Sequence, residues 1–521
     1  MNKKKSLLVL LAFSMIVFTG CAMFPNSGAV AESPERLESR FAVTRYARDV
    51  YMPIGGFGAP FANFFAPTGA TGPGHAGPGN RLMHHTQTAF DESAAIGLTF
   101  LIPDFFQIDF GNDPEYSMAF LDMAYNAGLQ VLVWDTGLGV PVNFRHPINH
   151  DIWDTTWARK YTQHPAFMGL HMVDEPSIGQ IPDLQLKVDR WNEEFPDTMI
   201  FINLHSSYGG ANVIGAPPSD FEGYRRFVTK ALDYLQVNPL SVDHYPFDVG
   251  LMVEGNTDPG FGGIWGMSPN YFKDLALIRQ LASERGVVSK SYILTSGHWK
   301  YKRDLTEEEL RWQIKVHQAF GFEMIAHYAI CLPFLDYDMF YENRRNPSLD
   351  TRQPIWYNVQ AVNHEIQKWD HVYMRFARNW MGTAPIYATG TTLTQQQMNT
   401  QYPFFGIIDG RDRIGADELT GITSLTTTQD ILAGRFADDA GNRGFMFTNV
   451  VNPMGPFMQT PGYVDGDEAA AVIELQFAHQ YRGLQIFERG ISRIVELDGN
   501  NAYTLTVPFK DGTFVIPLRL R

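Results

Sequence analysis

Cysteine is almost absent from this 521-residue sequence, which contains only Cys21 and Cys331. Cys21 follows a segment with the features of a lipidation signal, described below, so its sulfur would not be available for a disulfide. Cys331 lies in an apolar run, and we expect it to be a buried core residue. Internal disulfides are therefore excluded as a source of stability.

Clustered positive charge is also missing. The sequence has 41 Lys and Arg against 56 Asp and Glu, a formal net charge of −15, and both signs are spread along the chain. An acidic surface without basic clusters makes nucleic acid an unsuitable partner. The apolar content of 45% and aromatic content of 13% are enough for a large core and argue against disorder.

Only the N-terminus carries a hydrophobic run typical of targeting. Lysines at 3–5 precede an apolar run over 6–18, which is too short to span a bilayer comfortably. The run ends in Phe18-Thr19-Gly20-Cys21, which resembles a bacterial lipoprotein signal and implies lipidation of Cys21. We therefore expect a signal peptide over 1–21, a tether over 22–44, and a membrane anchor at Cys21 of an exported protein of the cell envelope. An ordinary cleaved signal peptide with an incidental cysteine is the alternative.

No Gly-rich phosphate loop follows an early strand: neither G-x-G-x-x-G nor a P-loop occurs between a strand and a helix. This argues against a doubly wound open sheet. Strand-like and helix-like segments alternate over 45–382, which predicts an α/β fold, a (β/α)8 TIM barrel. The eight predicted strands are Val50–Ile54, Gly97–Ile102, Leu129–Trp134, Phe167–Glu175, Met199–Leu204, Leu240–Val242, Ser291–Thr295 and Glu323–Ala326. The main predicted helices are Tyr116–Ala127, Leu184–Phe195, Tyr271–Arg285, Thr306–Phe320 and Ile355–Met374.

The pattern changes near residue 383. Short segments with alternating apolar and polar residues, such as Ala471–Phe477 and Tyr503–Val507, are separated by turns rich in Gly, Asn and Asp. This predicts a C-terminal antiparallel β-sandwich over 383–521. It contains no cluster of residues suited to catalysis, so packing against the barrel is its expected role, with carbohydrate binding as the alternative.

The most informative stretch is the fourth predicted strand, which ends abruptly on Asp174, Glu175 and Pro176. Pro176 has no N–H for a strand ladder, so the strand should stop near Glu175. Side chains at the carboxyl ends of parallel strands meet at one face of a barrel, where active sites lie. Glu175 is therefore a candidate for acid/base chemistry, unless the two acids merely cap the following loop or helix.

Other strand ends carry carboxylates, imidazoles and large aromatic side chains, a mixture that suits sugars. Aromatic faces stack on pyranose rings, and carboxylates and imidazoles bond hydroxyl groups. The histidines show no H-x-H or H-E-x-x-H spacing, so we expect no metal and no other cofactor. No G-x-S-x-G occurs, which argues against a serine esterase. The expected substrate-binding residues are Asp135, Asp174, His205, His244, Tyr245, His298, Trp299, His327 and Tyr328.

Three features together resemble the clan A-type (β/α)8 glycoside hydrolases, and among these the bacterial members with a D-E-P signature. They are Asp174-Glu175-Pro176 after strand four, Asp243-x-Tyr245-Pro246 after strand six, and the C-terminal β-sandwich. The resemblance implies that Glu175 is the general acid/base. The clan's nucleophile is a Glu at the end of strand seven, but this chain has Thr295–Trp299 there, without an acid.

The second carboxylate therefore has to come from elsewhere. Asp243 is the first candidate, and Glu254 in the following loop is the second. A separation greater than about 5 Å between Glu175 and Asp243 would favour inversion, with Asp243 activating water. The resemblance thus implies a glycoside hydrolase that cleaves a β-linked oligo- or polysaccharide. The alternative is a non-catalytic surface glycan-binding lipoprotein on a barrel scaffold.

Overall fold

The computed structural model describes residues 34–521 except 61–62, 65–73, 78–80, 104–107, 112, 142–145, 218, 248–269, 296–304, 333–336, 339–351, 380–384, 391–406, 410–420 and 452–469. Cys21 and the expected signal peptide lie outside the described residues. Among the helices of the described part, none is both long enough and apolar enough to cross a membrane.

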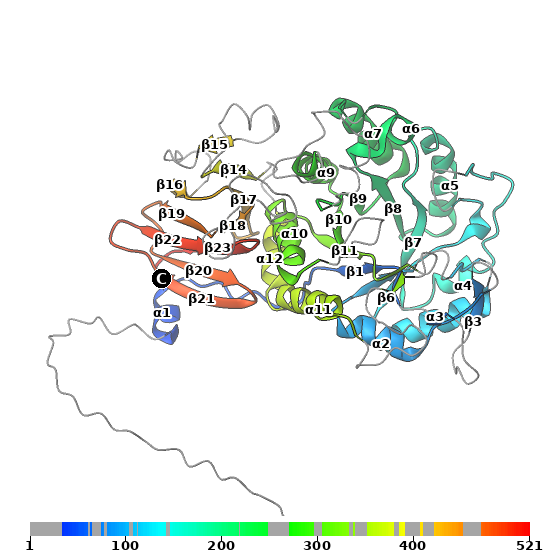
Figure 1. Ribbon diagram of the computed structural model, residues 1–521, viewed down its shortest axis with the longest axis horizontal. Coiled ribbons are helices and arrows are strands. Elements are labelled where there is room, and N and C mark those ends of the chain that lie inside the picture. The colour runs from blue at the N-terminus through cyan, green and yellow to red at the C-terminus, as the bar shows by residue number, and fades with distance from the viewer. Residues whose placement is uncertain are drawn as a thin grey trace, which may run out of the picture.

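Eight parallel strands close into a barrel, which occupies the right-hand part of Figure 1. They follow one another around the barrel in chain order, and the last strand pairs with the first, which confirms the predicted (β/α)8 fold. The strands are β1 (Ile54–Phe57), β5 (Phe100–Ile102), β6 (Gln130–Val133), β7 (Phe167–Asp174), β8 (Met199–His205), β9 (Leu240–Asp243), β10 (Ser289–Leu294) and β11 (Met324–Tyr328).

Helices connect the strands and surround the barrel (Figure 1). The longer ones are α2 (Gln87–Ala95), α3 (Pro114–Asn126), α5 (Ile181–Glu194), α7 (Phe221–Leu235), α9 (Tyr271–Arg285), α10 (Glu307–Ala319), α11 (Pro354–Gln367) and α12 (Asp370–Ala377). Shorter elements are α4 (Ala158–Tyr161), α6 (Gly210–Ile214), η2 (Thr136–Leu138) and η3 (Ser207–Gly209). Thr306 caps α10 as predicted, in a capping box with Glu309. The single helix predicted over 355–374 is instead divided into α11 and α12.

One local prediction near the first strand is wrong. The strand begins at Ile54 rather than Val50, directly after Pro53, which has no N–H to contribute to a ladder. The segment that follows contains a small sheet formed by β2 (Asn63–Phe64), β3 (Gly74–Gly77) and β4 (Arg81–His84). Gly55 is needed inside β1, because a Cβ there would lie 2.2 Å from the ring of Phe100.

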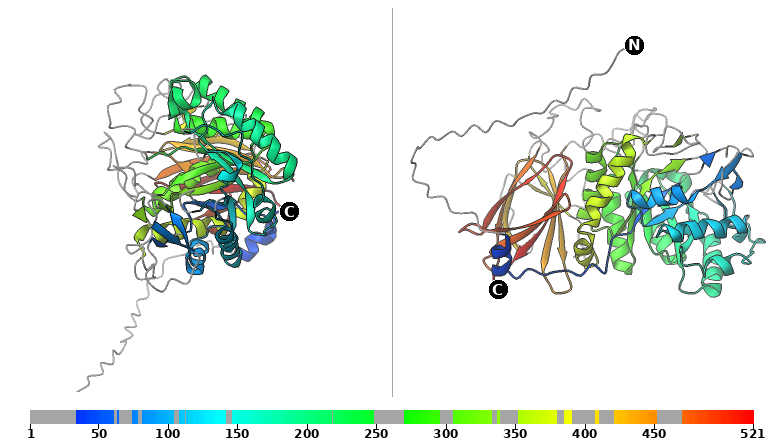
Figure 2. Two further views of the ribbon diagram at one scale, coloured as in Figure 1. Left: turned by 90° about the vertical axis from the view of Figure 1, so that its right-hand side faces the viewer. Right: turned by 90° about the horizontal axis from the view of Figure 1, so that it is seen from below.

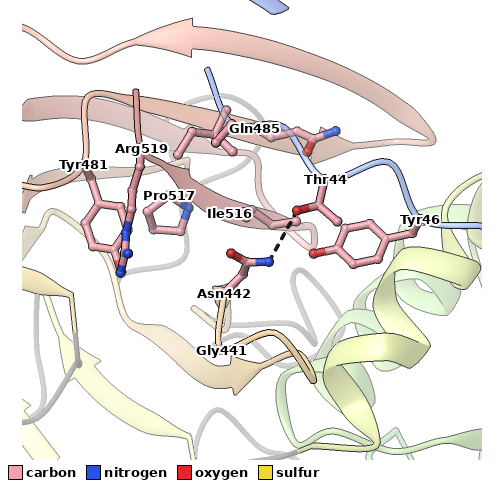
Figure 3. Close-up of a pocket in the computed structure, with 11 residues that line it drawn as sticks. Thr44, Tyr46, Gly441, Asn442, Tyr481, Gln485, Ile516, Pro517 and Arg519 are labelled. Atoms are coloured by element: carbon pink, nitrogen blue, oxygen red, sulfur yellow. Dashed lines mark hydrogen bonds between the residues drawn. The ribbon is translucent and has the colours of Figure 1, made fainter. Parts of the chain in front are cut away.

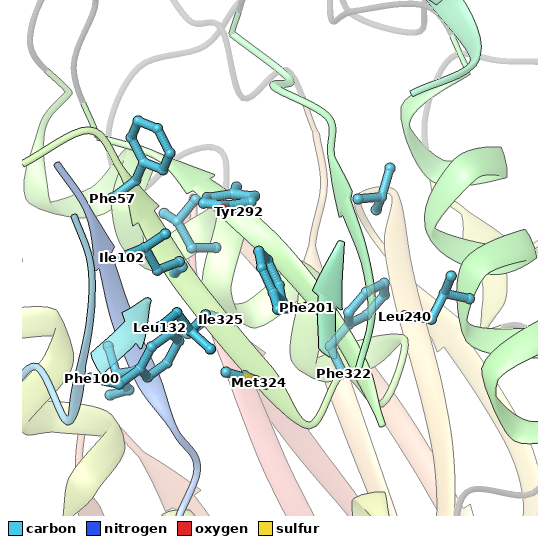
Figure 4. Close-up of a cluster of buried hydrophobic side chains, with 14 of the residues drawn as sticks. Phe57, Phe100, Ile102, Leu132, Phe201, Leu240, Tyr292, Phe322, Met324 and Ile325 are labelled. Atoms are coloured by element: carbon cyan, nitrogen blue, oxygen red, sulfur yellow. The ribbon is translucent and has the colours of Figure 1, made fainter. Parts of the chain in front are cut away.

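Apolar side chains fill the barrel and the layer between its strands and helices. Phe100, Phe201 and Ile325 belong to this core and are at most 1% exposed (Figure 4). Burial of such side chains is the main favourable term in folding, at roughly 25 cal/mol per Å² of apolar surface.

The C-terminal region contains two sheets with a shared core. The larger has the strand order β15-β14-β17-β18-β23-β20-β21, the smaller β16-β19-β22, and all neighbours are antiparallel except β14 and β15. Alternate residues of both sheets, among them Phe447, Leu475 and Val515, form the core between them. The strands are β14 (Ile386–Thr389), β15 (Ile407–Asp409), β16 (Ile422–Thr427), β17 (Ile431–Ala437), β18 (Arg443–Asn449), β19 (Ala471–Phe477), β20 (Gly483–Glu488), β21 (Ile491–Glu496), β22 (Ala502–Val507) and β23 (Gly512–Leu518). A further short hairpin, β12 (Cys331–Leu332) with β13 (Tyr337–Asp338), follows the barrel.

The larger sheet packs against α10 and α12 of the barrel region, as Figure 2 shows. Trp369, between α11 and α12, packs against Phe487 and Phe514, with ring centroids 5.7 and 5.5 Å apart. The N-terminal segment also reaches these sheets: α1 (Pro34–Arg40) precedes Phe41, which is fully buried and bridges to Leu520. The tether predicted for 22–44 is therefore too long, because its last part is folded against the C-terminal region.

Candidate active site

The carboxyl ends of β7, β8 and β9 bring the most important acids together. Strand register pairs Asp174 with Asn203 and His205 with Asp243. Residues paired across a sheet point to the same face, so each pair shares a side of the barrel wall. Asn203 donates from Nδ2 to Asp174 Oδ1 at 3.2 Å, which places this pair inside the barrel.

A backbone irregularity directly after β7 allows Asp174 and Glu175 both to face the mouth of the barrel. Successive side chains of a regular strand point in opposite directions. A register shift between His171 and Val173 sets the face of Asp174, and Glu175, just after the strand, adopts a left-handed backbone with φ of 49°. This conformation is unfavourable for a non-glycine residue and is characteristic of functional sites. As a result Asp174 and Glu175, although consecutive, both face the same space.

Glu175 and Asp243 form what we call the carboxyl pair. A side-chain hydrogen bond joins them, which requires one of the two to be protonated. Burial raises the pKa of Asp243 well above its usual range, and the charges of Glu175 and Asp174 raise it further. Asp243 is 9% exposed, and its Oδ1 has no hydrogen-bond donor among the described residues. These effects together favour the protonated form of the Asp243 carboxyl.

Glu175 is the more accessible member of the carboxyl pair, with 24% of its side chain exposed. His205 Nε2 lies 3.6 Å from Glu175 Oε1, so the predicted proximity of these two residues at the strand ends is present. The ring of Tyr208 packs edge-on against His205, with centroids 5.1 Å apart. This contact orients the imidazole beside the carboxyl pair.

Aromatic side chains form one wall of the same space. Tyr245 stacks on Tyr328 at a centroid distance of 5.1 Å, and Phe57 lies 5.3 Å from Tyr328. Tyr328 remains partly exposed, whereas Tyr245 is 7% exposed. Figure 4 shows Phe57 and Tyr292 of the barrel lining, which neighbour Tyr328. We call Phe57, Tyr245 and Tyr328 the aromatic wall.

His244 and His327 point away from the carboxyl pair, contrary to the expectation that they contact substrate. His244 Nδ1 bonds Asp274 Oδ2 of α9 at 2.7 Å, with both side chains fully buried. His327 bonds Thr295 Oγ1 at 2.9 Å and Asn363 Oδ1 of α11 at 2.8 Å. Burial lowers the pKa of His327 to about 4, so its imidazole is neutral. Each histidine neighbours a tyrosine of the aromatic wall in sequence, so strand alternation turns the histidine towards the helices.

The side chain of Asp135 also points away from the carboxyl pair. Its Oδ2 accepts from the Tyr161 hydroxyl of α4 at 2.8 Å, and its Oδ1 accepts from the Gly137 N–H at 2.8 Å. Burial raises its pKa to about 6. Trp134, one residue earlier, instead contacts His171 of β7 at a ring-centroid distance of 3.7 Å. Asp135 therefore caps η2 rather than joining the carboxyl pair.

Three other predicted residues, His298, Trp299 and Glu254, lie outside the described residues. Sequence reasoning missed Asn203, Ser241 and Lys290, which lie within the barrel beside the predicted acids. The available signal was spacing: Asn203 and Ser241 are two residues before His205 and Asp243, and so share their face of the strand.

The described ranges contain no metal site beside this arrangement. No group of three or more His, Cys, Asp or Glu side chains there is arranged to hold a metal ion. A small cavity of about 50 Å³ lies between the N-terminal segment and the C-terminal sheets (Figure 3). Asn442 Nδ2 donates to Thr44 Oγ1 at 3.3 Å across it. Its volume suits a water or two rather than a sugar ring.

No protein-family model matches the chain, and no curated protein matches it in sequence. Solved structures with partial similarity include proteins described as glycosidases. A putative α-galactosidase from Bacteroides fragilis gives a TM-score of 0.42 at 8% identity, covering 90% of this chain and 80% of that one. A β-galactosidase from G. stearothermophilus gives 0.40 at 9% identity, covering 92% and 99%. A putative α-L-fucosidase from Bacteroides thetaiotaomicron gives 0.38 at 10% identity, covering 63% and 98%. The chemistry of the site therefore has to be argued from this chain's own side chains.

Proposed function

We propose that the protein is a glycoside hydrolase that cleaves a β-linked oligo- or polysaccharide with Glu175 and Asp243. The observation that carries the proposal is the carboxyl pair at the mouth of the barrel, where burial and the neighbouring Glu175 raise the pKa of Asp243. Glycoside hydrolysis needs one carboxyl group to protonate the leaving oxygen and a second, ionised one at the anomeric carbon. A singly protonated pair supplies both forms at once.

The difference in exposure suggests the roles. Glu175 is the more exposed member of the carboxyl pair, and we assign it delivery of the proton to the glycosidic oxygen. The proton passes from Asp243 across their hydrogen bond, which leaves Asp243 ionised. As the C–O bond breaks, an Asp243 oxygen forms a bond to the anomeric carbon, and water, deprotonated by Glu175, later displaces it. Hydrogen-bond contact leaves no room for the intervening water of an inverting enzyme, whose carboxyl groups are about 6.5–9.5 Å apart, so we propose retention.

The surrounding residues would hold the sugar. The aromatic wall offers ring faces for a pyranose, and His205 and Asp174 offer polar groups beside Glu175. We do not include Asp135, His244 or His327, because their polar atoms are bonded to protein groups outside the mouth. Export and anchoring through Cys21 belong to the same proposal. A Cys21→Ser variant that is released from the membrane fraction would support them.

The experiment is hydrolysis of a panel of β-glucans, galactans and aryl β-glycosides by the mature protein. We expect Glu175→Gln and Asp243→Asn each to lower kcat/KM by about 10²–10⁴-fold, because each removes an acid/base group. Asp370→Asn is the matched control: it changes another buried carboxyl whose pKa burial raises to about 6, at the opposite end of the barrel near Met52. It should retain activity.

The first anomer released, followed by NMR, distinguishes the mechanisms. A β product from a β-glycoside supports retention, and an α product would contradict the assignment of Asp243 as nucleophile. If Asp243→Asn is active while Glu175→Gln is not, the second carboxylate lies elsewhere, with Glu254 the next candidate.

One observation favours the second candidate function, a non-catalytic glycan-binding protein. In the described part of β10, the seventh strand of the barrel, the inward-facing positions carry Lys290 and Tyr292 rather than an acid. Binding of a glycan without turnover by the wild type, unchanged in Glu175→Gln, would establish this alternative.

A further inference from the structure

A row of four polar side chains crosses the barrel interior from the mouth towards the opposite end. Asp174 of β7 pairs in register with Asn203 of β8, Asn203 with Ser241 of β9, and Ser241 with Lys290 of β10. We call these four residues the polar row. Asp174 is at the carboxyl end of its strand, whereas Lys290 is near the start of its own. Barrel interiors are usually filled by branched apolar side chains, so a buried row of this kind needs an explanation.

Hydrogen bonds connect the row without a break. Lys290 Nζ donates to Ser241 Oγ at 3.2 Å, Ser241 Oγ donates to Asn203 Oδ1 at 2.9 Å, and Asn203 Nδ2 donates to Asp174 Oδ1 at 3.2 Å. A lysine ammonium can only donate. Ser241 must therefore accept from it and turn its own proton towards Asn203, which fixes the orientation of the amide. The lysine thus determines that an N–H group faces Asp174.

Lys290 is fully buried among groups that influence its charge. Its Nζ lies 3.3 Å from the ring centroid of Tyr292 and 4.8 Å from that of Phe201, positions that favour a cation. Burial lowers the pKa of Lys290 well below its usual value, and the charges of Asp243 and Asp174 oppose only part of that effect. His171 of β7 also faces this region. Burial and then the charge of Lys290 lower the pKa of His171, so the imidazole stays neutral.

The charges at the mouth of the barrel suggest a role for the polar row. Asp174, Glu175 and Asp243 converge at the mouth, and a buried ammonium beneath them compensates part of their negative charge. We propose that Lys290, acting through Ser241 and Asn203, is a positioning residue that orients Asp174 and offsets the negative charge of the three acids at the mouth. This inference rests on the proposed function for its consequence in catalysis, but the state of the proton can be measured without substrate.

The test compares Lys290→Met, Ser241→Ala and the matched control Ser291→Ala in the mature protein. Ser291 is a buried serine of the same strand as Lys290, pairs with Val242, and is not part of the row. The readouts are the infrared carboxyl band that Asp243→Asn removes, followed against pH, and the pH dependence of kcat/KM.

Removing the ammonium should favour the protonated form of the nearby acids. We expect Lys290→Met to move the pH at which the carboxyl band disappears, and the acidic limb of kcat/KM, upward by about one unit or more. Ser241→Ala should shift both in the same direction by less, because Asp174 loses an oriented donor. Ser291→Ala should shift neither. In both row variants kcat should fall more than KM rises.

A folded Lys290→Met protein with the wild-type titration would overturn the proposal. If that variant does not fold, as judged by circular dichroism, Ser241→Ala decides: a titration equal to that of Ser291→Ala overturns the proposal, and an upward shift supports it. If the wild type cleaves no glycoside at all, the proposed function fails, while the infrared titration still decides the role of the row.

Discussion

Two groups of buried charges in this molecule differ in how well their acids and bases are matched. At the interface between α10, α11 and the larger C-terminal sheet, Glu365 pairs with Arg311 at 2.8 Å and with Lys315 at 2.9 Å. Lys510 pairs with Glu309 at 3.2 Å across the same interface. At the mouth of the barrel, by contrast, three carboxyl groups converge and one buried lysine lies beneath them.

The pKa values of Glu365 and Asp243 are shifted in opposite directions. Burial opposes ionisation of Glu365, but Lys315 and Arg311 outweigh it and lower its pKa. At Asp243, burial and the neighbouring acids act together and raise the pKa. A buried charge with an opposite charge beside it is a structural contact between elements. Like charges brought together in a cleft shift the pKa of the groups there, as is common at functional sites. The charges around Glu365 therefore form a structural cluster, whereas the acids at the mouth of the barrel have the character of a functional one.

The largest change in stability is expected when the carboxylate at the interface is removed. Glu365→Gln would leave the buried ammonium of Lys315 without its carboxylate and remove one of the two carboxylates that pair with Arg311, and we expect the free energy of unfolding to fall by about 3–5 kcal/mol. Because the folded pKa of Glu365 is lowered, its stabilisation is present above the unfolded pKa and is lost as pH falls through the folded value. Urea unfolding at pH 7 measures the loss. A loss below about 1 kcal/mol would contradict the structural role.

Replacing a carboxylate by an amide at the mouth of the barrel should instead increase the free energy of unfolding. Between the unfolded pKa of Asp243, about 3.9, and its raised folded value, the folded protein holds a proton that the unfolded chain releases, so stability falls as pH rises. Asp243→Asn cannot ionise, and we expect it to increase the free energy of unfolding by about 1–3 kcal/mol at pH 7.

This gain should vanish below about pH 3.9, where the wild-type carboxyl is protonated in both states. The measurement is urea unfolding of both proteins at pH 3.5 and pH 7. An Asp243→Asn protein less stable than the wild type at pH 7 would show that the carboxyl pair is a structural contact rather than a strained functional one.

The smallest effect is expected at an exposed pair. Arg40 of α1 lies 2.7 Å from Glu496 of β21, with the side chains 40% and 45% exposed. Solvent and salt screen such a pair, so Glu496→Gln should change the free energy of unfolding by less than about 1 kcal/mol. Thermal unfolding at low and high salt measures it. A larger loss would show that docking of α1 contributes more than its one ion pair suggests.

Parts of the site followed from the order of residues alone. Apolar runs ending on polar residues located seven of the barrel strands, whereas the segment predicted for the first strand overlaps β1 only at Ile54. The Pro after Glu175 located the end of β7. Because parallel strands of a barrel end at one face, strand ends far apart in sequence, such as those carrying Glu175 and Asp243, were expected to meet there, and they do.

What the sequence could not provide was the direction of each side chain. His244 and His327 are at strand ends, as predicted, but turn towards α9 and α11. In a parallel barrel one face of each strand meets the core and the other meets the helices, so both faces are apolar and no alternation marks the inner one. The register shift in β7 and the left-handed backbone at Glu175 further change the alternation within a single strand.

The sequence by itself therefore determined the barrel, the C-terminal sheets and the strand ends at which chemistry is possible, because local periodicity and turn residues specify secondary structure. Only the tertiary structure decided which strand-end residues face one another, and it revealed Lys290 beneath the acids. Register between strands depends on barrel closure, which pairs residues as far apart in sequence as Ile54 and Ile325, and no local pattern encodes such pairs.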